Sequence, residues 1–233
     1  FLINIALIGF LFQLGVPKLA ERVASKLDND LMIAIGNSAQ KKLDSTIFSE
    51  SKLSAEKQQR LKSLFKHSIG FMYLANSKYK TDIHYNIKFR DSSNKLATAF
   101  GLPNGTIIVT DKLVNILKSE TPLLIMMAHS AGHIYNRHRV KATLEESLPR
   151  LIYSYLFPNS LNTRVFSSDL LKQLETLSYP AHMEKQATTL AADFMAANQI
   201  KAINLRSTIK TRVKKPYTQQ HPGTIQQTKK TEE

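Results

Sequence analysis

The sequence contains no cysteine, and acidic residues are scarce in it. Without cysteine, the chain cannot form a disulfide framework, a thiolate zinc site, an iron–sulfur cluster or a cysteine nucleophile. It also lacks a glycine-rich phosphate loop, a dinucleotide-binding fingerprint and a serine nucleophile elbow.

The shortage of acids leaves the chain strongly basic. Lysine and arginine number 32 against 18 acidic residues, which gives a net charge of +14. Such an excess is typical of proteins that meet nucleic acid or an anionic membrane surface. The 233 residues, 42% of them hydrophobic, suffice for one domain with its own core, so folding alone requires neither a disulfide nor a metal.

Residues 1–16 form an apolar run without a charged side chain. Because a helix needs about 20 apolar residues to cross a bilayer, the run predicts the end of a membrane anchor, with a buried core helix as the alternative. Lys18, Arg22 and Lys26 follow directly, and the preference of basic residues for the cytoplasmic side would place them there. We therefore expect a membrane-associated protein.

Local patterns after this run predict helices and then strands. Apolar residues have helical spacing from Pro17 to about Ile69, and Ser54 is placed to cap a helix. Alternating apolar and polar residues over 82–90 predict a half-buried strand. Asn104-Gly105 between two apolar runs predicts a β-hairpin.

Three more helices are predicted after the hairpin: from Asp111 to about Lys118, from Thr121 to about Glu146, and from near Tyr179 onward. The fold class is therefore α+β, with a mainly α-helical domain and a small antiparallel sheet beside the second of these helices.

The end of the chain has a different composition. Residues 201–233 contain eight lysines and arginines against two glutamates, which is typical of a solvated tail. We therefore expect a domain over residues 17–204 and a basic tail over residues 205–233.

Three of the seven histidines fall within ten residues: His129, His133 and His138. The first two are four residues apart on a predicted helix, so their imidazoles share one face. Two nitrogens at that spacing can hold one metal ion, although a helix can also carry two histidines without a ligand.

The surrounding segments resemble a known peptidase family. AFGLPNGTIIVTDKLV, MMAHSAGHIYNRH and YPAHMEKQATTLA are similar, in order and spacing, to three blocks of the zinc metallopeptidases that include HtpX, the OMA-type proteases and the CAAX prenyl endopeptidases. His221-Pro222-Gly223-Thr224 resembles a fourth, shorter block. The resemblance spans residues 88–224 and implies a metallopeptidase fold with His129 and His133 as zinc ligands.

The chain departs from the family pattern at three positions. Ser130 stands where the family has the glutamate that acts as general base, so this resemblance implies a position that no longer functions in catalysis. Gln186 stands at the position that the resemblance assigns to the third zinc ligand. Thr188 replaces an aspartate that supports the site from behind the ligands.

The same resemblance assigns Glu184 and His138 to this supporting role rather than to the metal. A neutral amide at Gln186 would hold zinc weakly or not at all, and His221 could add another nitrogen.

The hairpin strand beside the metal-site helix accepts substrate as an added strand in the resembled family. That role would fall to Thr106, Ile107, Ile108, Val109 and Thr110. The alternative is that this strand lies in the interior of the sheet.

We therefore expect a membrane-associated pseudopeptidase that binds peptides or partner proteins after losing hydrolysis. One alternative is a working zinc endopeptidase, of the kind that acts in membrane protein quality control, with a base supplied by Glu184 or His182. Another is a basic module that binds membrane lipid through residues 201–230. Nucleic acid is not an expected partner, because the basic stretches lack interleaved aromatic residues.

Overall fold

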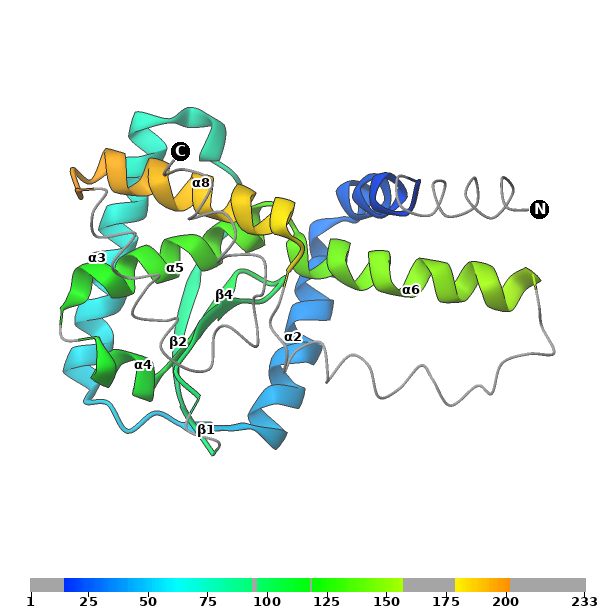
Figure 1. Ribbon diagram of the computed structural model, residues 1–233. Helices are drawn as coiled ribbons and strands as arrows, with labels where there is room; N and C mark the ends of the chain where they lie inside the picture. The colour runs from blue at the N-terminus through cyan, green and yellow to red at the C-terminus, as the bar shows by residue number, and fades with distance from the viewer. Residues whose placement is uncertain (1–14, 94–95, 118, 157–178, 202–233) are drawn as a thin grey trace, which may run out of the picture.

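A computed structural model describes residues 15–93, 96–117, 119–156 and 179–201. Helices surround a small sheet, and α6 extends away from it (Figure 1). The helices are α2 (Asn29–Thr46), α3 (Ala55–Ala75), α4 (Asp111–Ile116), α5 (Glu120–Tyr135), α6 (His138–Leu156) and α8 (Ala181–Ala197), with another helix over residues 15–26 and a short 3₁₀ helix at Ser77–Tyr79. The predicted α+β class is confirmed.

The sheet has four strands in the order β1-β2-β4-β3. The strands are β1 (Phe48–Glu50), β2 (Asn86–Ser92), β3 (Ala99–Gly101) and β4 (Thr106–Thr110). The predicted hairpin is present as the antiparallel pair β3–β4, but β2 and β4 are parallel, so the sheet is mixed rather than antiparallel. The reason is that the chain crosses from β2 to the far edge, forms β3 there, and returns beside β2 as β4.

Local sequence signals account for the ends of several elements. The Ser54 side chain accepts a hydrogen bond from Lys57 N and caps α3, as predicted. Gly105 has φ +83°, the left-handed conformation that the hairpin turn requires. Asp111, almost fully buried at the start of α4, accepts hydrogen bonds from Ser51 Oγ and Lys52 N, both at 2.6 Å, and so ties down the loop before α3.

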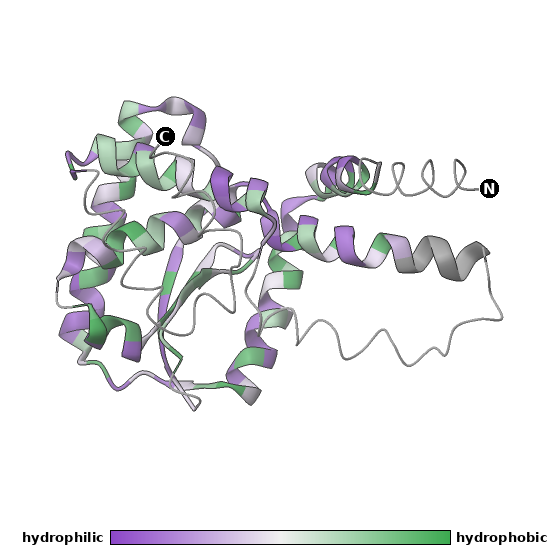
Figure 2. Cartoon of the chain, in the orientation of Figure 1, coloured by the Kyte–Doolittle hydropathy of each residue, from purple (hydrophilic) through white to green (hydrophobic). Residues whose placement is uncertain are grey.

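Helix α5 lies between the sheet and α8, and its apolar residues form the centre of the core (Figures 1 and 2). Nearly all of α5 is buried, with Met127, Ala128 and Ala131 at 0% exposure. A helix that is apolar on every side requires such burial. This environment excludes water from most of the helix that carries the paired histidines.

The helix predicted over residues 121–146 is in fact two helices. The chain breaks at Asn136-Arg137, where Arg137 has φ +56°. The Arg137 guanidinium donates to the carbonyls of Ala24 and Leu27, at 2.8 and 2.6 Å. This contact with the end of the helix over residues 15–26 supports the uncommon backbone conformation. As a result, His138 becomes the first residue of α6 and turns back toward α5.

Helices α5 and α8 approach each other closely because small residues meet at their contact. A Cβ atom added to Gly132 would lie 2.7 Å from Ala187 Cα and 2.8 Å from Ala187 O. Only glycine fits at this point of α5. The close approach brings the first turn of α8 over the paired histidines.

Two predicted segments, the apolar run 1–16 and the tail 205–233, lie outside the described residues. Only residues 15 and 16 of the apolar run are described. Among the helices that the structure describes, none combines the length and apolarity needed to cross a membrane. The division of the chain at residues 17 and 204 stays a prediction.

Candidate metal centre

Helices α5 and α8 bring three ligand-type side chains to one point. His129 and His133 project from α5, one turn apart, and Glu184 projects from the first turn of α8. The two Nε2 atoms are 3.0 Å apart. Glu184 Oε2 lies 3.2 Å from His129 Nε2, and Glu184 Oε1 lies 3.7 Å from His133 Nε2. The three residues form a candidate metal site.

These spacings fit a zinc ion. With zinc–nitrogen and zinc–oxygen bonds of about 2.0–2.1 Å, neighbouring ligand atoms of a tetrahedral site are about 3.3 Å apart. The observed separations of 3.0, 3.2 and 3.7 Å lie around that value. Two imidazoles and one carboxylate are also a donor set that holds catalytic zinc ions and leaves a fourth position open.

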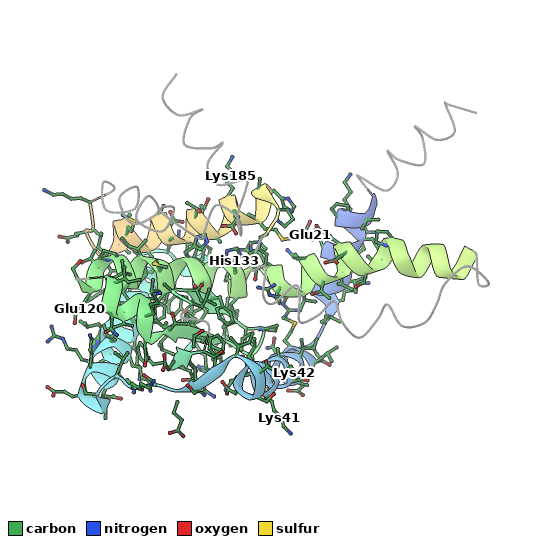
Figure 3. The ribbon with its side chains drawn as sticks, turned by 60° about the horizontal axis from the view of Figure 1, so that its bottom comes forward. Glu21, Lys41, Lys42, Glu120, His133 and Lys185 are labelled. Atoms are coloured by element: carbon green, nitrogen blue, oxygen red, sulfur yellow. The ribbon has the colours of Figure 1, made fainter. Side chains whose placement is uncertain are left out.

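The site is buried but reachable from one side. The side chains of His133 and Glu184 are 7% and 5% exposed, whereas that of His129 is 16% exposed. In Figure 3, His133 lies where α8 passes over the junction of α5 and α6. Access to an ion would therefore be along the edge occupied by His129.

The third candidate ligand is a carboxylate and differs from the residue predicted from the sequence. Glu184, which was expected to support the ligands, lies within ligand distance of both histidines. Gln186, expected as a weak third ligand, instead uses its Oε1 atom to contact His138 Nε2 at 2.7 Å. The reason is helical geometry, because residues two apart on α8 point about 200° apart. The candidate ligand set therefore includes one negatively charged side chain.

A chain of polar contacts leads from His133 into the protein. His133 Nδ1 lies 3.0 Å from His138 Nδ1. With His133 Nε2 facing the metal position, its Nδ1 carries the proton and donates to His138, whose Nε2–H then donates to Gln186. Burial lowers the pKa of His138 to about 4, although the bond to Gln186 acts in the opposite direction, so this imidazole is neutral near pH 7. The arrangement fixes both the tautomer and the ring orientation of His133.

Ser130 follows His129 on α5, but its side chain is not suited to act as a general base. Its side chain is almost fully buried, and its hydroxyl donates to Met126 O at 2.9 Å, within the same helix. A hydroxyl takes up a proton poorly near neutral pH, and this one is already committed to a backbone carbonyl.

The other predicted site residues differ in exposure, and one of them lies outside the described residues. Thr188 is half-buried on α8, and His182 is exposed near the start of that helix. His221 lies outside the described residues.

Strand β4, for which a peptide-binding role was predicted, lies in the interior of the sheet. Strand β4 pairs with β2 along one edge, from Thr106 to Thr110, and with β3 along the other. Flanking hydrogen bonds from Leu102 N to Thr106 O and from Thr110 N to Thr98 O complete the second edge. All five residues are buried, so the alternative of a strand in the sheet interior describes β4.

Sequence reasoning also missed an aromatic residue at the site. The Tyr179 ring stacks on His133, with centroids 4.0 Å apart and planes 20° apart. Its position two residues before α8 gave no ligand signal. Glu184, by contrast, could have been found from helical period, because it shares the buried face of α8 with Ala187 whereas Gln186 is exposed.

A mainly helical domain with a small sheet and a His-His-Glu site on two packed helices defines a metallopeptidase-like protein. The chain matches peptidase family M48 over residues 55–231 and belongs to that family. Comparison with curated proteins gives no match.

Proposed function

We propose that the chain is a zinc-binding pseudopeptidase, in which the metal ligands persist and peptide hydrolysis is impaired. The observation that carries this proposal is the contrast between two neighbouring positions on α5. His129 meets His133 and Glu184 at zinc-ligand spacing, whereas the Ser130 hydroxyl bonds to Met126 O. General-base catalysis typically contributes about 10²–10⁴-fold to a rate, and this contribution is lost.

The chain's own residues would act on the ion in defined ways. His129, His133 and Glu184 would hold it, and His138 and Gln186 would keep His133 in the coordinating tautomer. A bound zinc ion acidifies its water and polarises a carbonyl oxygen. With Ser130 in place of a general base, the site would bind a carbonyl or carboxylate group more readily than it would hydrolyse a peptide.

The second candidate is a working zinc endopeptidase with an unusual base. The favourable observation is the complete ligand set, which a decayed enzyme has no need to keep. Glu184 would be occupied as a ligand, which leaves His182, exposed near the start of α8, as the base proposed from the sequence. This candidate predicts hydrolysis that depends on both zinc and His182.

Binding of a peptide or protein partner is part of the same proposal. A peptide strand could not join β4, because β2 and β3 already pair with its two edges. A carbonyl or carboxylate group of the partner would instead bind at the open fourth position of the site formed by His129, His133 and Glu184.

We also propose membrane association, through residues 1–16 and the basic residues that follow. Lys18, Arg22 and Lys26 are exposed on the helix over residues 15–26. Basic residues near an anionic lipid surface contribute about 1 kcal/mol each to binding. Flotation with anionic vesicles tests this, and equal binding to neutral vesicles would remove the electrostatic part.

The decisive experiment combines metal content with hydrolysis. The purified chain should bind one zinc ion and should not cleave an unfolded protein such as reduced casein. Ser130→Glu should raise zinc-dependent cleavage by at least about 100-fold, while Ser130→Ala, the matched control, should leave zinc affinity and inactivity unchanged. Cleavage by the unaltered chain that His129→Ala abolishes would overturn the pseudopeptidase proposal and favour the endopeptidase.

A further inference from the structure

The face of the His133 ring is covered by a tyrosine, not by an aliphatic core residue. Tyr179 stacks on it at 4.0 Å and an interplanar angle of 20°. The Arg139 guanidinium carbon lies 4.8 Å from the centroid of the Tyr179 ring. The Tyr179 ring is therefore in contact with both the His133 imidazole and the Arg139 guanidinium.

This stack restrains a motion that the polar contacts leave free. The Nε2 atom of His133 faces the metal position, and its Nδ1 contacts His138 at 3.0 Å, both in the plane of the ring. Contacts in the plane do not prevent the ring from tilting about the line between the two nitrogens. A planar group packed on the face does prevent it.

Tyr179 also connects two of the ligands. It lies two residues before the start of α8, and the next residue, Pro180, accepts a hydrogen bond at its carbonyl from Glu184 N at 3.1 Å. The stack therefore fixes the start of α8 against α5. One side chain thus limits both the tilt of His133 and the distance from His133 to Glu184.

We propose that Tyr179 is a positioning residue of the metal centre, which orients His133 by stacking and is itself held by Arg139. This inference rests on the proposed zinc binding. An imidazole that coordinates a dication becomes electron-poor, and the electron-rich face of tyrosine attracts it. The stack is therefore stronger with metal than without it, and it raises metal affinity rather than fold stability alone.

The test is a competition titration of Zn²⁺ against a chromophoric chelator, using the whole chain and its variants. Tyr179→Leu should lower zinc affinity by about 10- to 100-fold, the range found for residues behind metal ligands. Tyr179→Phe keeps the ring and should stay within about threefold of the unaltered chain. Arg139→Gln weakens the support of the ring and should lower affinity by about two- to fivefold.

The matched control is Phe48→Leu, because Phe48 also stacks on an aromatic ring, that of Phe100, with centroids 6.1 Å apart. This pair belongs to a core cluster that contains none of the metal ligands. Phe48→Leu should lower the thermal unfolding temperature and leave zinc affinity unchanged. The visible absorption of bound Co²⁺ adds a readout of geometry, which should change with Tyr179→Leu and not with Phe48→Leu.

Equal zinc affinity in Tyr179→Leu and the unaltered chain would overturn the inference, and so would a loss in Phe48→Leu as large as that in Tyr179→Leu. If Tyr179→Leu does not fold, the zinc affinities of Arg139→Gln and Tyr179→Phe test the inference instead. A loss of zinc affinity of tenfold or more in Tyr179→Phe would contradict a stacking role. Absence of zinc binding by the unaltered chain would instead refute the proposed function.

Discussion

Replacing Gly132 by alanine should push apart the two helices that carry the metal ligands. The new Cβ atom would lie 2.7 Å from Ala187 Cα, about 0.7 Å short of the 3.4 Å at which ordinary contact begins. The clashing atoms belong to the backbone of α8, so no side-chain rotation relieves them. The helix itself must move, and Glu184 moves with it.

The size of the effect follows from two opposing contributions. Overpacking of this kind costs about 1–3 kcal/mol, while alanine in a helix gains about 0.5–1 kcal/mol over glycine. We therefore expect Gly132→Ala to lower the free energy of unfolding by about 1–2 kcal/mol. Metal sites tolerate errors of about 0.2 Å in their distances, so zinc affinity should fall by at least about tenfold.

Gly70 provides the matched control, because it also lies within a helix, α3, and a Cβ atom there would meet nothing within 4 Å. Gly70→Ala should stabilise the protein by about 0.5–1 kcal/mol and leave zinc affinity unchanged. Urea unfolding and a zinc titration measure both quantities. If Gly132→Ala were as stable as Gly70→Ala and bound zinc normally, the close contact between α5 and α8 would be wrong.

Gln186→Leu should lower zinc affinity by roughly 10- to 100-fold, and Glu184→Gln should lower it by more, because only Glu184→Gln removes a charged ligand. A zinc titration that gave the reverse order would restore Gln186 as the ligand. Partial burial raises the pKa of Asp44, but the hydrogen bonds from Arg90 and Gln40 and the positive charges of Arg90 and Lys88 together outweigh it and leave this pKa below its usual value. The stabilisation by Asp44 is thus complete above about pH 4 and is lost as the pH falls through the lowered pKa. Asp44→Asn should therefore lower the free energy of unfolding in urea by about 1 kcal/mol at pH 7 and by less below pH 4. A loss that does not depend on pH would contradict this. Asp111→Ala should cost about 2 kcal/mol by leaving two donors in the loop before α3 without their acceptor, and a change below about 0.5 kcal/mol in the same assay would count against that role.

Features with local causes could be predicted from the sequence. Ser54 caps α3, and Asn104-Gly105 forms the turn of the β3–β4 hairpin, because each depends on a few neighbouring residues. The spacing of His129 and His133 likewise predicted a shared helix face. Such signals require no knowledge of the rest of the fold.

Features with tertiary causes could not be predicted in the same way. The break between α5 and α6 contains neither glycine nor proline, and Arg137 keeps its left-handed conformation through bonds to carbonyls more than 100 residues away in sequence. The parallel pairing of β2 with β4 depends on where the chain places β3. Glu184 is a different case, because the helical period of α8 places it on the buried face. The resemblance instead gave the ligand role to the second glutamate position of the family pattern, where this chain has Gln186.

Bound zinc and the cleavage of an unfolded protein, measured on one preparation of the chain, test the pseudopeptidase proposal directly. We expect one zinc ion per chain, held by His129, His133 and Glu184, and no zinc-dependent cleavage until Ser130 is replaced by glutamate. A chain that holds no zinc would contradict the retained ligand set. A zinc-loaded chain that cleaves its substrate with Ser130 in place, and stops when His129 is replaced by alanine, would contradict the loss of hydrolysis.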